Sequence, residues 1–116
     1  MTDSILTAIK KLLGITENDE SFDDDIVIYI NSVFMTLTQF GVGPTAGFSI
    51  SSKTSVWGDF LQGNKNLEAV KTYIYLKTRM LFDPPTNAAL ISAIDGTIKE
   101  TEYRLITQVE DFTPTP

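Results

Sequence analysis

The segment from Gly47 to Thr54 comes nearest in this chain to a phosphate-binding loop. It reads Gly-Phe-Ser-Ile-Ser-Ser-Lys-Thr, one residue away from the P-loop pattern, in which a second glycine precedes the lysine. Ser52 occupies that glycine position, where the backbone must bend close to the phosphates. The segment also follows a helical pattern and a turn, whereas a P-loop follows a core strand. We therefore interpret it as a polar loop that carries one lysine, Lys53.

A run of acidic residues between positions 17 and 25 could be taken for a calcium loop. An EF-hand loop needs glycine at its sixth position and glutamate at its twelfth. Counted from Glu17, these positions hold Phe22 and Ile28, and counting from Asp19 fails in the same way. We interpret the run as helix capping plus a solvated acidic loop, with a surface for a basic partner as the alternative. We predict no metal site and no cofactor.

Histidine and cysteine are both absent from the chain. Their absence removes the commonest general base, the thiolate nucleophile and the usual zinc ligands. Paired carboxylates without a recognisable pocket are weak support for acid–base chemistry. We therefore predict that the protein is not an enzyme. The alternative, an unrecognised enzyme that uses carboxylates or Lys53, would be supported by a small molecule that stabilises the fold specifically.

The charges of the chain argue against nucleic-acid binding. The net charge is −6, with 15 acidic and 9 basic residues, and Lys10–Lys11 is the only adjacent basic pair. A protein that grips phosphates needs a concentrated basic surface. No apolar run approaches the roughly 20 residues of a membrane span, and no basic-then-apolar leader opens the chain. We expect neither specific nucleic-acid binding nor a membrane association.

Length and hydropathy patterning predict one mainly all-α domain. A chain of 116 residues with 42% apolar residues can bury a single core. Apolar spacing predicts a small bundle of four to five helices, over about 3–13, 21–40, 55–61, 67–82 and 86–110. We expect residues 1–110 to form the domain, with 41–66 as a protruding loop or short β-arm that includes the short helix. Residues 111–116 are expected to be a flexible C-terminal tail.

The second predicted helix has the clearest signals. Ser21 is its expected N-cap, and Asp23, Asp24 and Asp25 lie in its first turn, where acids complement the helix dipole. Gly41 is expected to close it. Ile28 and Met35 lie seven residues apart, outside the main apolar stripe of this helix. A helix that is apolar on two sides is either central to the core or shared with a partner.

The middle segment carries the aromatic side chains whose role the sequence leaves open. Phe48 to Ser51 alternates apolar and polar residues, which fits a short strand or an extended arm. Trp57 fits either of two roles, a plug in the core or an anchor in an interface. If Trp57 is in the core, Trp57→Ala should unfold the monomer. If it is an anchor, the same change should spare the fold and block assembly.

The last two helices are separated by Pro84–Pro85, which cannot continue a helix. Asp95–Lys99 and Glu100–Arg104 are spaced as i,i+4 pairs in the last helix. Gly96 weakens this helix, which suggests close packing or a bend at that position. Its expected buried face consists of Leu90, Ile94, Ile98, Leu105 and Val109.

Taken together, these segments resemble the small head–tail connector (adaptor or head-completion) proteins of tailed bacteriophages. The resemblance covers about residues 4–110. It rests on Ile5-Leu-Thr-Ala-Ile-Lys-Lys-Leu-Leu-Gly-Ile15, then an acidic linker, Phe22-Asp-Asp-Asp and a long apolar helix. The second half agrees through Leu67-Glu-Ala-Val-Lys-Thr-Tyr-Ile-Tyr-Leu-Lys-Thr-Arg79, Phe82-Asp-Pro-Pro85 and Glu102-Tyr-Arg-Leu105. The segment 42–63 is longer than in the compact members of the family.

The resemblance implies a structural role in assembly. Such proteins add beneath the portal after DNA packaging, form a ring with its twelve-fold symmetry and extend the channel towards the tail. The implied partners are other copies of the chain, the portal protein and downstream neck or tail proteins. The implied location is the virion neck, and the host cytoplasm during assembly. By position, 42–63 would be the family's docking arm and 110–116 its docking tail.

We accordingly expect ring contacts at Phe48, Ile50, Val56 and Trp57 in the arm and at Phe112 in the tail. We further hypothesise that Asp23, Asp24 and Asp25 form an acidic channel or partner surface, since negative walls would not hold passing DNA. The competing interpretation is a small helical regulator that binds one protein and forms no ring. A stable one-to-one complex would favour it.

Overall fold

The computed structural model describes residues 4–44, 46–61 and 67–112. Five helices follow one another along the chain: α1 (Ile5–Leu12), α2 (Asp23–Gln39), α3 (Trp57–Leu61), α4 (Leu67–Phe82) and α5 (Ala88–Phe112). Within the described residues no strand is present, and the only β-type pairing is an isolated antiparallel bridge between Ser4 and Val56. The predicted all-α bundle is confirmed.

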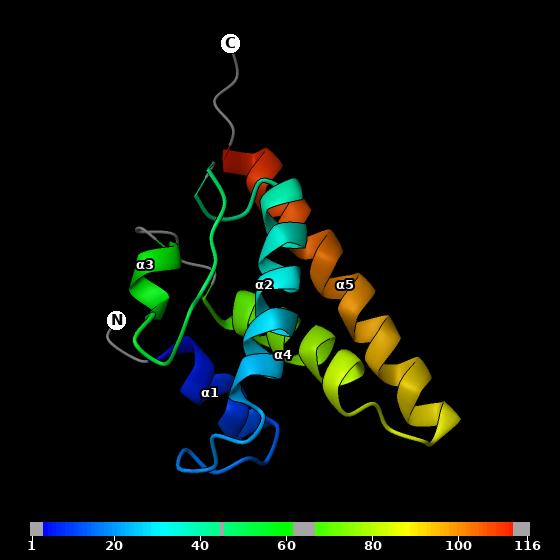
Figure 1. Ribbon diagram of the computed structural model, residues 1–116. Helices are drawn as coiled ribbons and strands as arrows, with labels where there is room; N and C mark the ends of the chain where they lie inside the picture. The colour runs from blue at the N-terminus through cyan, green and yellow to red at the C-terminus, as the bar shows by residue number, and fades with distance from the viewer. Residues whose placement is uncertain (1–3, 45, 62–66, 113–116) are drawn as a thin grey trace.

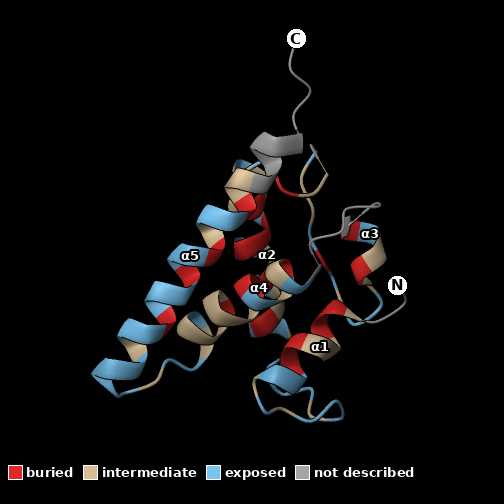
Figure 2. Cartoon of the chain, turned by 180° about the vertical axis from the view of Figure 1, so that it is seen from behind, coloured by how far each residue is buried: buried red, intermediate tan, exposed pale blue. Residues whose placement is uncertain are grey.

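Helices α2 and α4 cross at the centre of the molecule (Figure 1). The main apolar stripe of α2 faces this crossing, with Ile26, Ile30, Val33, Phe34 and Leu37 all buried. Helix α5 packs along α4 on one side, and α1 contacts both α2 and α4 on the other. Figure 2 shows that the outer side of α5 is largely exposed.

The start of α2 differs from the prediction. Its N-cap is Phe22, which makes no capping hydrogen bond through its side chain. Ser21 instead donates from its backbone N–H and its hydroxyl to the Asp19 carboxylate, at 3.1 and 2.6 Å. The hydroxyl that was expected to cap the helix therefore belongs to a local turn. Asp23, Asp24 and Asp25 do occupy the first turn, and Gly41, at φ +82°, follows the last turn as predicted.

The described part of the middle segment, 41–44 and 46–61, packs on the core and does not protrude. It folds back along α2, and Val42, Ile50, Trp57 and Phe60 are 0–3% exposed. Asn31 of α2 holds the extended part of the segment, because its side-chain amide pairs with both backbone groups of Ile50. The Asn31 amide N–H donates to the Ile50 carbonyl at 2.9 Å, and the Ile50 N–H donates to Asn31 Oδ1 at 2.7 Å. The segment thus completes the core.

Helix α5 confirms its predicted pairs and corrects its predicted face. Asp95–Lys99 and Glu100–Arg104 form exposed ion pairs of 3.1 and 2.7 Å. Leu90 was expected to be buried but is 42% exposed. Gly96 has open space around it, so close packing does not explain that glycine.

Asn87 caps the start of α5, since its Oδ1 accepts from the Leu90 N–H at 3.1 Å. The helix continues to Phe112, two residues beyond its predicted end, so the expected tail begins inside the helix. Residues 113–116 and the side chains of Val109 and Phe112 lie outside the described part of the structure.

Candidate interaction surfaces

The side chains predicted to anchor an interface lie mostly inside the subunit. Trp57 is fully buried and Ile50 is 3% exposed, while Phe48 and Val56 are half-buried. Phe48 packs edge-on against Phe34, with ring centroids 4.9 Å apart. Trp57 is therefore a core residue of the subunit. Ile50 and Trp57 would contact a neighbour only if the segment left the core, and a contact at Phe112 stays a prediction.

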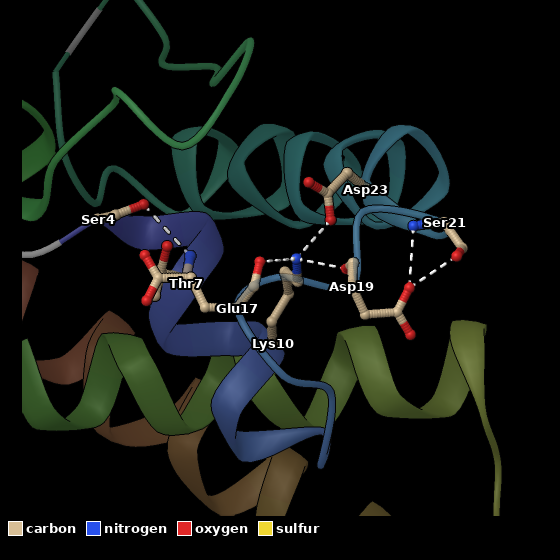
Figure 3. Close-up of polar contacts among 7 residues, drawn as sticks. All are labelled: Ser4, Thr7, Lys10, Glu17, Asp19, Ser21 and Asp23. Atoms are coloured by element: carbon tan, nitrogen blue, oxygen red, sulfur yellow. Dashed lines mark hydrogen bonds and ion pairs between the residues drawn. The ribbon is translucent and has the colours of Figure 1, made fainter.

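The acidic run is organised around one buried lysine, Lys10 of α1. Its side chain is 3% exposed, and its ammonium lies 2.8 Å from Asp23 Oδ1 (Figure 3). The same ammonium donates to the backbone carbonyls of Glu17 and Asp19 at 3.1 and 2.7 Å. Because three hydrogen-bonding directions are used, the ammonium is well compensated for its burial. Asp23 is consequently part of an internal ion pair.

The remaining acids of the run face outward. Glu17, Glu20, Asp24 and Asp25 are all exposed. The hydrogen bonds from Ser21 lower the pKa of the Asp19 carboxyl below its ordinary value. Asp24 and Asp25 are therefore exposed acids whose channel or partner role stays a prediction, whereas Asp23 serves mainly to hold α1 against α2.

A second apolar side of α2 is exposed. Ile28 is 63% exposed and Met35 is 65% exposed. A spacing of seven residues places both on one side of the helix, opposite the stripe that packs on α4. We call Ile28 and Met35 the α2 stripe. Of the two explanations that the sequence left open, the structure excludes burial of the α2 stripe in the subunit core.

An open groove of about 830 Å³ lies between α1 and α4. Its walls combine apolar surface from Leu12 and Tyr75 with two basic side chains, Lys11 and Lys71. The Lys71 ammonium also lies 5.5 Å from the centre of the Trp57 ring. The residues that line this α1–α4 groove are Ser4, Thr7, Ala8, Lys11, Leu12, Glu68, Lys71, Thr72 and Tyr75.

The segments that were considered for chemistry show no assembled site. Lys53 is exposed on a turn in which Ser52 Oγ and Thr54 Oγ1 lie 2.8 Å apart. Among the described residues, no group of three or more His, Cys, Asp or Glu side chains is placed to hold a metal ion. In the same part of the chain, no helix is long and apolar enough to cross a membrane.

The family model for phage connector proteins matches residues 5–111. The chain belongs to this family. It is therefore a connector-type structural protein of a phage, and the family indicates a virion component that associates with portal or tail proteins. No curated protein and no solved structure matches the chain.

Three features of this phage connector were not predicted from its sequence. By sequence, Lys10 and Lys11 form only a basic dipeptide, although Lys10 lies one helical turn after Leu6 on the buried side of α1. That spacing was the available signal for a buried lysine. The Asn31–Ile50 pairing joins residues 19 positions apart, and the groove is formed by two helices far apart in the chain. Neither of these has a local sequence pattern.

Proposed function

We propose that this connector forms a ring beneath the portal and joins the DNA-filled head to the tail. The match to phage connector proteins over residues 5–111 carries this proposal. The ring contains about twelve copies, in keeping with the symmetry of the portal, and its lower side receives the next neck or tail protein. The protein acts by packing and has no catalytic activity.

The exposed α2 stripe supports assembly over a solitary subunit. Ile28 and Met35 are each about two-thirds exposed, although the same helix supplies five buried residues to the core. Two exposed apolar side chains seven residues apart on one side of a helix are placed to anchor that helix in a partner. In the virion, the neighbours on which a connector packs would cover Ile28 and Met35.

The acidic surface at Asp24 and Asp25 suits the wall of a DNA channel. Both carboxylates are exposed, and negative walls repel the phosphate backbone so that DNA passes without being held. If this surface faces the channel, Asp24→Asn with Asp25→Asn will slow DNA ejection, which is measured as dye uptake by released DNA. The double variant Glu100→Gln with Arg104→Gln, on the outer side of α5, serves as the control. Unchanged ejection in the Asp24/Asp25 variant would remove the channel assignment.

Removal of the gene from the phage genome tests the joining role. The proposal predicts that DNA-filled heads and free tails accumulate separately, and that purified protein added to this lysate restores tailed, infectious particles. Tailed particles that form without the protein would contradict it. A stable one-to-one complex with a single partner, with no ring on the portal, would instead indicate a regulator.

A further inference from the structure

The subunit has two broad faces that differ in character. Its extents are 49 × 35 × 19 Å, so it is a thin plate. Helix α2 lies on one broad face (Figure 1), and α1 and α4 lie in front of it when the molecule is viewed from behind (Figure 2). The helix that carries the α2 stripe therefore lies toward the front, and the two helices that line the groove lie toward the back.

Helical spacing agrees with this division. Ile28 and Met35 lie on the side of α2 away from its buried stripe, which packs on α4. On α4, the groove residues Lys71, Thr72 and Tyr75 alternate with the buried Val70, Tyr73 and Ile74 in the way expected of two different sides of one helix. Stripe and groove thus point in different directions.

We propose that the α1–α4 groove of one subunit receives the α2 stripe of the next copy in the ring. This inference rests on the proposed ring function and names the contact that builds it. A helix laid in a groove uses anchors along one side of the helix, as Ile28 and Met35 are placed. Met35 is flexible and polarisable, so it adapts to an irregular groove. Leu12 and Tyr75 provide the apolar surface that the anchors cover.

Charge complementarity selects a second copy as the occupant. Asp24 and Asp25 are exposed at the end of the α2 stripe. The groove is lined by two lysines, Lys11 and Lys71, and by one acid, Glu68, so its charge is positive on balance. Within the described residues, neither the two aspartates nor the two lysines form an ion pair in their own subunit. A contact from front to back pairs the two acids of one subunit with the two lysines of the next, which makes Asp24 and Asp25 a partner surface, the alternative to their assignment to the channel wall. Because the two surfaces differ, the contact can repeat around a ring, whereas a self-complementary contact would stop at a dimer.

Cysteine cross-linking tests this contact, because the chain has no cysteine of its own. Met35→Cys and Thr72→Cys are combined in one chain, since both positions are exposed and neither change disturbs the core. A short bismaleimide is added to the full-length protein, both free at high concentration and bound to portal rings. The proposal predicts a ladder of covalent oligomers on a denaturing gel. Met35→Cys alone should give no species above a dimer, and Met35→Cys with Tyr103→Cys on α5 should give no ladder.

Charge reversal provides a second test of the contact. Lys11→Glu with Lys71→Glu in one chain, or Asp24→Lys with Asp25→Lys in another, should each weaken self-association by at least about tenfold in sedimentation velocity. An equal mixture of the two chains should recover alternating oligomers, because opposite charges again meet. If the mixture of the two charge-reversed chains forms no oligomers, the proposed charge pairing is wrong.

The outcomes separate this inference from the proposed function. A ring on the portal without a ladder overturns the front-to-back contact and leaves the connector role intact. A ladder in the free protein that never binds the portal supports the contact and overturns the connector role. A ring together with a ladder supports both.

Discussion

At the scale of single residues, Lys10 joins three parts of the chain through one ammonium group. It links α1 to the 14–22 loop through two carbonyls and to α2 through Asp23. A lysine that is 3% exposed is uncommon, and it is tolerated here because its hydrogen-bonding capacity is used. Lys10 therefore anchors the acidic run at Glu17, Asp19 and Asp23, while the side chains of Glu17, Glu20, Asp24 and Asp25 are exposed.

Replacement of Lys10 by alanine should destabilise the subunit. The change leaves Asp23 without its partner and frees both loop carbonyls, so we expect the free energy of unfolding to fall by about 2 kcal/mol. Urea denaturation followed by circular dichroism measures it. Lys11→Ala is the matched control, because Lys11 is the exposed neighbour and should change stability by less than about 0.5 kcal/mol. Equal losses in the two variants would contradict the role given to Lys10.

Trp57 provides a second prediction at this scale. The side chain is fully buried among the core residues, so Trp57→Ala should create a cavity and lower the free energy of unfolding by about 3–5 kcal/mol. The thermal melt of the isolated protein should show this loss before any partner is added. Tyr103→Ala, at a position that is 71% exposed, is the control. If Trp57→Ala melts like wild type but no longer assembles, Trp57 is an interface anchor and not a core residue.

At the scale of elements, the middle segment depends on a glycine in a left-handed conformation. Gly43 has φ +88°, and a Cβ added there would overlap the Phe60 ring. Gly43→Ala should therefore both strain the backbone and displace Phe60, at a cost of about 2–3 kcal/mol. Gly14→Ala is the matched control, since Gly14 also has positive φ but has nothing within 4 Å of the added carbon. Differential scanning calorimetry should rank Gly43→Ala well below Gly14→Ala, and similar melting temperatures would contradict the steric argument.

The contact between α4 and α5 includes a hydrogen bond that is sensitive to alkaline pH. The Tyr73 hydroxyl donates to Glu102 Oε2 at 2.8 Å. Burial, and then the neighbouring Glu102 carboxylate, raise the pKa of Tyr73 above its ordinary value. A pKa that is higher in the folded state gives stability below the ordinary tyrosine pKa of about 10, and this stability is lost as the pH rises above it.

Urea denaturation between about pH 8 and about pH 11 tests this linkage. Wild type should lose stability across the upper part of this range, and Tyr73→Phe should lose less there while starting about 1 kcal/mol lower. Tyr103→Phe, at the exposed position on α5, should follow wild type. Parallel profiles for wild type and Tyr73→Phe would show that Tyr73 is not the responsible group.

The helices were predictable from sequence because their signals are local. Apolar spacing located all five, Pro84–Pro85 separated α4 from α5, and α4 has the predicted bounds of 67 and 82. The failures concern a competing local hydrogen bond, one contact between distant segments and the exposure of the first turn of α5. Ser21 hydrogen-bonds to Asp19 instead of capping α2, and Asn31 draws the predicted arm into the core. Leu90 has a buried spacing but lies in the first turn of α5, where it is 42% exposed.

At the scale of the whole molecule, the candidate surfaces could be predicted only partly from the sequence. The second apolar side of α2 was visible as a spacing, but its exposure depends on α4 covering only the first side. Three of the four residues expected to form the arm's contacts, Phe48, Ile50 and Trp57, pack in or against the core, because the segment that carries them folds back on α2. The resulting subunit is a thin plate, with the two exposed apolar side chains of α2 toward one face and a groove that carries two lysines and one glutamate toward the other.

Electron cryomicroscopy of the protein bound to portal rings from the same genome tests the connector role most directly. The purified protein is mixed with portal rings, the complex is sedimented, and the pellet is imaged without imposed symmetry. We expect a closed ring coaxial with the portal, at its tail-facing end, with the front face of each subunit against the back face of the next. Folded protein that fails to bind the portal, or that binds as a single copy, would contradict the connector role.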